Sequence, residues 1–242
     1  NGGGKTAVLD AVAVALRLFV DTMEGHAASK GFDAWDIRTV RREDGAMEAV
    51  PPVRLEAGAR MMGEDLFWAR ERASRSASRT TTAEAQGLRR WAEGLSRENT
   101  RWVEGKIQAP PDFPLIAYYG TGRLWQQKKR IEGKFARTSR TIGYTDCLDP
   151  ASSYKSFVEW FRYWSNSAKS GRIEALEAGR VYVRSEFDDY IDSVGEAVNQ
   201  CLAPSGWKNV SYSLTREELE ADHDQHGRLP VERHLHRWRE GD

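Results

Sequence analysis

Apolar residues recur at helical spacing in the first half of the chain and predict two helices there. The first spans residues 5–21 and is expected to end near Gly25. Its apolar face consists of Val8, Val12, Leu16, Phe19 and Val20. The second follows the threonines at 80–82, which are expected to cap it, and ends near Gly105. Its apolar face consists of Leu88, Trp91, Ala92, Leu95 and Trp102.

Between these helices the pattern predicts antiparallel strands. Residues 35–42 and 47–57 are expected to pair around the Asp44-Gly45 turn, because that dipeptide favours a tight hairpin. Pro51-Pro52 would place the middle of the second strand at an edge or a bulge, since proline cannot donate to a ladder. A further short strand is predicted over residues 66–72.

The second half of the chain is predicted to be mainly helical. From Ser152, four aromatic residues form a stripe at helical spacing: Phe157, Trp160, Phe161 and Trp164. Gly171 is expected to break this helix, and residues 174–202 to form a second one that Pro204-Ser205-Gly206 stops. Residues 210–214 alternate as a strand, and 215–218 carry a capping-box pattern that is typical of a helix start.

Taken together, these elements predict an α/β fold with antiparallel β hairpins and a helical insert. We expect three segments: residues 1–123 as the first part of the domain, 124–205 as the insert, and 206–242 as a return segment.

Charge and cysteine content narrow the class of protein. Lys and Arg together number 36, as do Asp and Glu, so a basic footprint over the whole chain is excluded. The basic run 128–140 leaves two readings open, a nucleic-acid contact or a solvated helical face.

No apolar run is long enough for a membrane span. Two cysteines are too few for a disulfide framework, which favours a reducing, cytoplasmic location without membrane contact.

The most specific motif is at the start of the chain, Asn1-Gly2-Gly3-Gly4-Lys5-Thr6. It matches the last six residues of a Walker A loop, and an amphipathic helix follows directly. Glycines let backbone N–H groups surround phosphates, Lys5 would pair with the β- and γ-phosphates of ATP, and Thr6 would place its hydroxyl on Mg²⁺. The alternative is a glycine-rich tag remnant before an unrelated helix.

This loop resembles that of the SMC and ABC branch of P-loop ATPases. A second segment, 115–125, begins with the apolar run Leu-Ile-Ala-Tyr-Tyr, which predicts a buried central strand, and continues into Gly120-Thr121-Gly122-Arg123. It is similar to the middle segment of bacterial AAA-type ATPases described as predicted ATP-binding proteins involved in virulence, a group related to anti-phage defence ATPases. The resemblance extends over essentially the whole chain in order.

The resemblance implies a partial P-loop sheet of the ABC/SMC-like type and ATP and Mg²⁺ as cofactors. It also implies a head-to-tail homodimer whose opening, driven by ATP hydrolysis, gates an effector or nucleic-acid partner. Arg123 would then contact phosphate or couple nucleotide to the partner subunit, with a structural turn as the alternative. Gln126 or Gln127 would be the glutamine that senses metal and water. These side chains follow a predicted strand end, where ligands of open α/β sheets bind.

Late in the chain, four histidines cluster with acidic residues: His223, His226, His234 and His236. A zinc site is conceivable there, but the spacing matches no strong pattern and thiol ligands are absent, so a solvated loop is favoured.

An ATPase of this class also needs a signature motif and a Walker B strand ending in Asp-Glu. The sequence contains neither, so we expect no catalytic residue within residues 1–242 and interpret the chain as a piece of a longer ATPase. Gly227-Arg228-Leu229-Pro230 resembles the segment that precedes the signature, which suggests a frameshift or sequencing error near residue 233. The alternative function is a non-catalytic interaction module whose tryptophan-rich helices bind a protein behind a glycine-rich linker.

Overall fold

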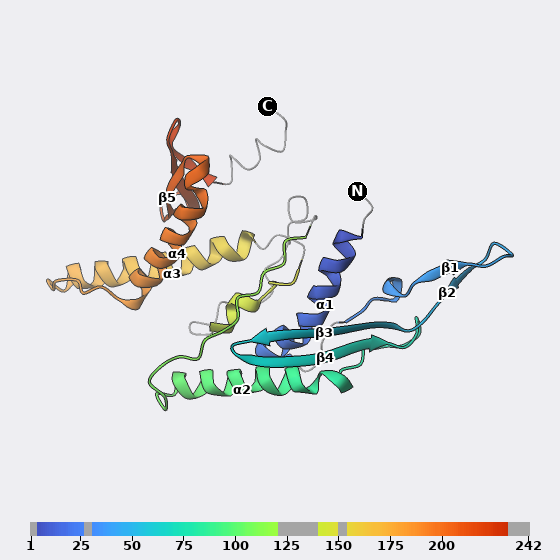
Figure 1. Ribbon diagram of the computed structural model, residues 1–242. Helices are drawn as coiled ribbons and strands as arrows, with labels where there is room; N and C mark the ends of the chain where they lie inside the picture. The colour runs from blue at the N-terminus through green and yellow to red at the C-terminus, as the bar shows by residue number, and fades with distance from the viewer. Residues whose placement is uncertain (1–3, 27–30, 121–139, 150–153, 232–242) are drawn as a thin grey trace. The chain divides into compact units, whose positions relative to one another are not determined.

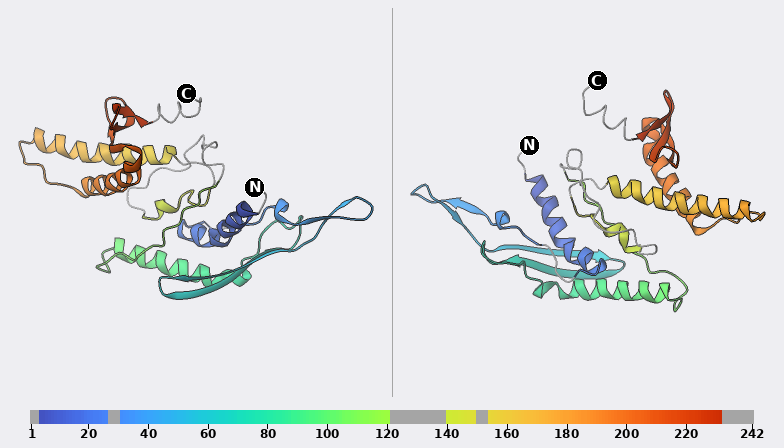
Figure 2. Two further views of the ribbon diagram at one scale, coloured as in Figure 1. Left: turned by 45° about the horizontal axis from the view of Figure 1, so that its top comes forward. Right: turned by 180° about the vertical axis from the view of Figure 1, so that it is seen from behind.

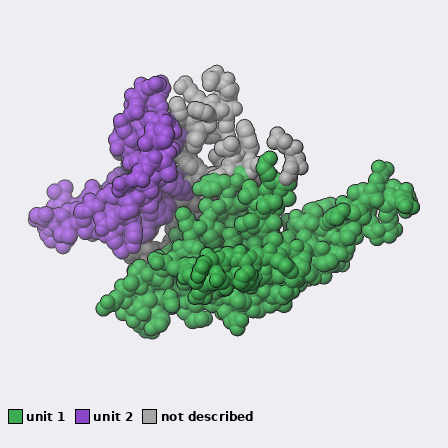
Figure 3. Space-filling view, in the orientation of Figure 1, with its two compact units in different colours: residues 1–127, 136–152 green, residues 128–135, 153–242 purple. Residues whose placement is uncertain are grey.

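The computed structural model describes residues 4–26, 31–120, 140–149 and 154–231, apart from the side chains of 154–156. These residues form two compact units (Figure 3). The described residues between 4 and 149 belong to the first unit, and those from 154 to 231 belong to the second. The chain is therefore a mixed α/β protein with small antiparallel sheets, as the sequence predicts at this coarse level.

Two helices and a long hairpin build the first unit (Figure 1). Helix α1 (Lys5–Met23) and helix α2 (Gln86–Val103) pack with strands β3 (Val53–Met61) and β4 (Glu64–Arg72). Leu18, Phe19 and Val20 of α1 are almost fully buried, and Leu88 and Ala92 of α2 share their core. Both helices thus form where the apolar stripes predict them, with Gly105 in the left-handed conformation just after α2.

The strand prediction between these helices is right in type and partly wrong in extent. Strands β1 (Thr39–Arg41) and β2 (Met47–Ala49) pair around the Asp44-Gly45 turn, as expected. However, residues 34–36 form a short 3₁₀ helix. The stretch 47–57 is divided at Pro51-Pro52, so that its second part begins β3 and pairs with β4 instead of β1.

The helix cap expected at residues 80–82 is also corrected. Thr82 precedes a 3₁₀ turn over Ala83–Ala85, and its side chain makes no capping hydrogen bond. Thr80 is buried instead, where its hydroxyl oxygen accepts a 2.8 Å hydrogen bond from the Phe32 backbone N–H. The threonine therefore closes a tertiary contact over 48 residues of sequence.

Residues 115–120 do not form the buried central strand that was expected. The segment has no strand assignment, and its exposure alternates along the chain. Ile116 and Tyr118 pack against the first unit's core, whereas Leu115 is 98% exposed and Tyr119 is 68% exposed. One face of an extended segment is therefore packed and the other is open.

The second unit begins with two long helices. Helix α3 (Tyr154–Glu177) runs through Gly171, so the expected break at this glycine is wrong. The break lies instead at residues 178–185, and helix α4 (Glu186–Leu202) then turns back beside α3 (Figure 2). The Ser185 side chain and Asp188 cap α4 reciprocally, which explains why this helix starts twelve residues later than predicted.

A three-stranded antiparallel sheet completes the second unit. Strands β5 (Trp207–Ser213), β6 (Glu218–His223) and β7 (Gly227–Pro230) pair in sequence order. Their apolar side chains pack on Phe161, which is fully buried in α3. Residues 215–218, which carry the capping-box pattern, complete the β5–β6 turn, with Glu217 at φ 54°, and begin β6 at Glu218, so the predicted helix start is wrong.

None of the helices that the structure describes is long and apolar enough to cross a membrane.

Candidate nucleotide-binding site at the start of helix α1

Helix α1 begins directly after a glycine in the left-handed conformation. Gly4 is the N-cap residue, and its φ of 70° lies in the left-handed region that glycine adopts without a Cβ penalty. Its carbonyl oxygen accepts the first helical hydrogen bond, 3.1 Å from the Val8 nitrogen. The first turn carries no acidic residue, so no carboxylate neutralises the positive end of the helix dipole.

Lys5 and Thr6 follow directly and are exposed. Neither side chain forms a hydrogen bond or ion pair with a residue that the structure describes. The backbone N–H groups of the first turn, which have no partner within the helix itself, lie beside these two exposed side chains. In this arrangement the N–H groups and Lys5 can bind an anion such as a phosphate, and the Thr6 hydroxyl can coordinate a metal ion that the phosphate carries.

The other predicted site residues are outside the described part of the chain. These residues are Asn1, Gly2, Gly3, Arg123, Gln126 and Gln127. The residues after 231, which follow the segment that resembles the approach to a signature motif, are outside it as well. The roles assigned to all of these residues therefore stay predictions.

A hydrogen bond brings the segment that precedes Thr121 close to the candidate site. The Tyr118 hydroxyl donates to Asp10 Oδ1 at 2.5 Å, and the Tyr118 backbone N–H donates to the Cys147 carbonyl at 2.8 Å. Asp10 is five residues from Lys5, or about 7.5 Å of helix rise. The hydrogen bond to Asp10, together with burial, raises the pKa of the Tyr118 hydroxyl to about 12.

Further along, α1 is fastened to the hairpin through its own carbonyl groups. The Trp68 indole N–H donates to the Ala15 carbonyl at 3.0 Å, and the Arg70 guanidinium donates to the Val14 carbonyl at 2.9 Å. Both donors come from β4 and are buried. Because these two buried side chains fix the middle of the helix, the position of its N-terminal turn is fixed as well.

The basic run 128–140 is described at one residue, Arg140. Its guanidinium lies 4.5 Å from the centre of the Phe113 ring and 5.5 Å from that of Trp102, and it donates to the Pro111 carbonyl at 2.8 Å. This arginine packs on aromatic rings within the first unit. It belongs neither to a solvated face nor to an open basic surface.

Of the four late histidines, His223 and His226 are described. Their rings stack with centres 4.8 Å apart, and His223 Nδ1 accepts a hydrogen bond from the Gln225 backbone N–H. Among the described residues, the group that could hold a metal ion does not include either histidine. His234 and His236 lie outside the described residues.

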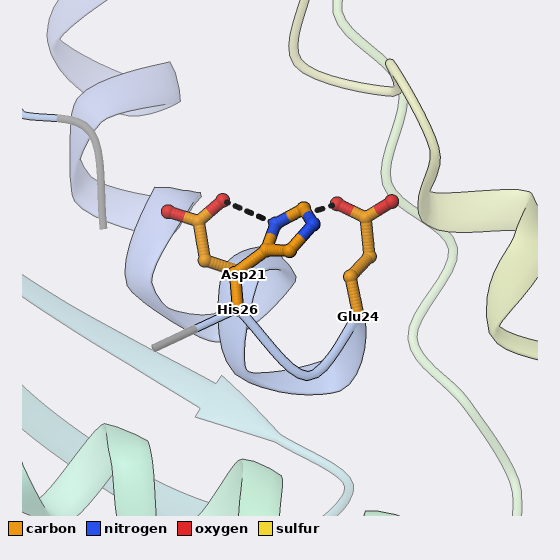
Figure 4. Close-up of side chains that lie close together, drawn as sticks. All are labelled: Asp21, Glu24 and His26. Carbon is orange, nitrogen blue, oxygen red and sulfur yellow. Dashed lines mark ion pairs between the residues drawn. The ribbon is translucent and has the colours of Figure 1, made fainter. Parts of the chain in front are cut away.

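Sequence reasoning missed a different group at the other end of α1. Asp21, Glu24 and His26 bring one ligand atom each to within 4.8 Å of one another (Figure 4). The signal in the sequence was present: two acidic residues on the last turn of a predicted helix, then Gly25 and a histidine. This pattern alone does not predict a metal site, because the direction of the His26 ring depends on how the helix ends.

Comparison with protein-family models gives no match, and comparison with curated protein sequences gives none either.

Proposed function

We propose that this chain carries the phosphate-binding part of a P-loop ATPase of the ABC/SMC-like class. The observation that carries the proposal is the sequence Gly4-Lys5-Thr6 at the N-terminus of a 19-residue helix, with Gly4 left-handed and both side chains exposed. A glycine-rich loop that leads into a helix is the arrangement by which P-loop proteins hold nucleotide phosphates.

In this proposal each residue has a separate task. The N–H groups after Gly4 and the dipole of α1 bind phosphate oxygens. Lys5 neutralises the β- and γ-phosphates, and Thr6 holds Mg²⁺ through its hydroxyl. Asp10 and Tyr118 are positioning residues, because their hydrogen bond holds the segment before Thr121 against the helix. Arg123 and Gln126 would approach the same nucleotide from that segment.

Binding of ATP·Mg²⁺ would support a homodimer that closes around nucleotide and opens after hydrolysis, which would gate an effector or a nucleic-acid partner. The catalytic groups for hydrolysis are expected outside residues 1–242, because these residues contain neither a signature motif nor a Walker B strand.

The alternative, a protein-interaction module that uses its tryptophans, receives less support. The Trp164 ring packs against Phe187 and Tyr190, with ring centres 5.4 and 5.1 Å apart. Trp160 packs against Phe161 in the same way, at 5.2 Å. The contacts of Trp164 join α3 to α4, whereas Trp160 and Phe161 are neighbours on α3, so both tryptophans are engaged in packing within the second unit.

The proposal is tested by nucleotide binding to the full-length protein. Lys5→Ala should weaken ATP·Mg²⁺ binding by at least about tenfold, because a charge-assisted contact to phosphate is worth roughly 1.5–3 kcal/mol. Lys106→Ala is the matched control, since Lys106 is an exposed lysine of the same unit that pairs with Glu104. Equal affinity of the Lys5→Ala variant and the wild type would remove Lys5 from its proposed role.

A further inference from the structure

The backbone at the C-terminal end of α1 determines where the His26 ring lies. Gly25 adopts φ 78°, and the helix closes with two hydrogen bonds, from the His26 N–H to the Asp21 carbonyl at 2.7 Å and from the Gly25 N–H to the Thr22 carbonyl at 3.1 Å. This is the Schellman pattern. It reverses the chain, so that the histidine ring returns over the carboxylates of the last turn.

The distances from the His26 ring nitrogen to the two carboxylates are too long for hydrogen bonds, and they suit three atoms that bind one ion. His26 Nδ1 lies 3.8 Å from Asp21 Oδ1 and 3.8 Å from Glu24 Oε2 (Figure 4). Both distances exceed a hydrogen bond. A cation equidistant from the three atoms, which all lie within 4.8 Å of one another, would be roughly 2.2–2.5 Å from each, close to the ~2.0–2.2 Å of zinc–nitrogen and zinc–oxygen bonds.

The two carboxylates are held in place and largely removed from water. Asp21 is 6% exposed, and its Oδ2 has no hydrogen-bond partner among the residues that the structure describes. The Glu24 side chain is 16% exposed, and its Oε1 accepts a 2.9 Å hydrogen bond from the Thr145 hydroxyl, which leaves Oε2 facing the ring. Hydrogen bonds of this kind orient metal ligands in proteins.

The group lies among charges of both signs, because Arg17 and Arg89 are close enough to Arg70 to lower its pKa. Arg70 is buried and interacts electrostatically with Asp21, so it offsets one of the two carboxylate charges. Glu24 then contributes a second negative charge, and the C-terminal end of α1 adds the partial negative charge of the helix dipole.

We propose that Asp21, Glu24 and His26 bind one divalent transition-metal ion, of which Zn²⁺ matches the ligands best. Imidazole nitrogen and carboxylate oxygen are both zinc ligands, and three protein ligands leave one position for water. The ion would hold the turn after α1 against the last turn of the helix, and the Thr145 hydroxyl would orient Glu24. The site is separate from the proposed Mg²⁺ position at Thr6, because fifteen residues of helix correspond to about 22 Å.

The test is calorimetric titration of ZnCl₂ into the full-length, untagged protein without nucleotide. The wild type should bind one Zn²⁺ that His26→Ala and Glu24→Gln each weaken by at least about tenfold. His226→Ala is the matched control and should leave that binding unchanged, because His226 is an exposed histidine of the other unit. A Cys147→Ser/Cys201→Ser background excludes thiol binding.

The proposal is overturned if the wild type binds no Zn²⁺, or if His26→Ala binds it as tightly as the wild type does. The His26 side chain is 60% exposed, so its replacement should leave the fold intact, and far-UV circular dichroism checks this. A second readout is the melting temperature, which saturating Zn²⁺ should raise in the wild type and not in His26→Ala.

Discussion

The Tyr118 hydroxyl donates a 2.5 Å hydrogen bond to the Asp10 carboxylate, across 108 residues of sequence. This contact joins the second turn of α1 to the segment that leads toward Thr121. The two stretches that sequence reasoning associates with nucleotide therefore meet in the first unit, although Arg123 itself lies outside the described residues.

Replacing Tyr118 with Phe should remove this contact and leave the packing of the ring. The bond is exposed to solvent, so the free energy of unfolding should fall by about 1 kcal/mol or less. Urea denaturation of the two proteins at neutral pH measures the difference. An unchanged midpoint would mean that the hydrogen bond contributes nothing to the position of the segment.

The same pair predicts a pH dependence. The pKa of Tyr118 is raised to about 12 in the folded protein, against an ordinary value of about 10, so the folded state holds the proton more tightly. Its contribution is complete below pH ~10 and is lost as the pH rises toward 12.

Wild-type stability should therefore fall more steeply than that of Tyr118→Phe between these two values. Tyr144 and Cys147 also have raised pKa values, of about 12 and 11, because they are buried. Since both groups titrate in both proteins, the difference between the two curves isolates Tyr118. Parallel curves over this range would contradict the assigned hydrogen bond.

A second prediction concerns Gly25. Gly25→Ala should lower the free energy of unfolding by about 1 kcal/mol, because alanine is strained at a φ of 78°. Gly94→Ala in the interior of α2 is the matched control and should raise it by about 0.5–1 kcal/mol. Thermal unfolding of both variants measures the two signs. If Gly25→Ala were as stable as the wild type, the Schellman turn that places His26 would not be required.

In the second unit, Asp188 is expected to make the free energy of unfolding depend on pH in the acid range. It is 2% exposed, and burial alone would raise its pKa. Hydrogen bonds from the Tyr182 hydroxyl, from Ser185 and from the Arg172 guanidinium outweigh burial and hold the pKa well below its ordinary range.

Its stabilising effect is therefore complete above pH ~4 and declines as the pH falls further, since the unfolded chain takes up the proton first. Asp188→Asn should cost roughly 1–3 kcal/mol near neutral pH and should flatten the acid limb of the stability curve. Asp189→Asn, at an exposed neighbour that pairs with Arg184, is the control and should change little. Equal effects of the two substitutions would refute the special role of Asp188.

The sequence was sufficient where one local signal determines the element. The helical spacing of α1, the Asp44-Gly45 turn and the Pro204-Ser205-Gly206 stop all act within a few residues, and the structure confirms each. The predicted apolar face of α1 is buried only in its second half, since Val8 and Val12 are exposed. The break predicted at Gly171 is wrong because the free-energy cost of a glycine inside a helix is small compared with the stabilisation from tertiary packing. A Cβ there would meet the Tyr182 ring at 3.5 Å, so the helix continues beneath a ring from a later segment.

For the proposed nucleotide site, the motif predicts Gly4, Lys5 and Thr6 at a helix start regardless of the remaining fold, and α1 begins at Lys5. Sequence reasoning could not find the group around His26 in the same way. The ring lies over Asp21 because of the left-handed Gly25, and Glu24 is oriented by Thr145, which is 121 residues away. Contacts of that range depend on the tertiary fold and leave no local pattern.

The most direct test of the central claim is where nucleotide binds. Backbone amide chemical shifts of the isotope-labelled full-length protein should be followed by NMR while ATP·Mg²⁺ is added. The account predicts that the largest changes occur at Gly4, Lys5 and Thr6, that these are lost in Lys5→Ala, and that His26 is unaffected. Saturating ATP·Mg²⁺ that leaves the amides at the start of α1 unchanged would contradict the claim that this turn is a phosphate-binding loop.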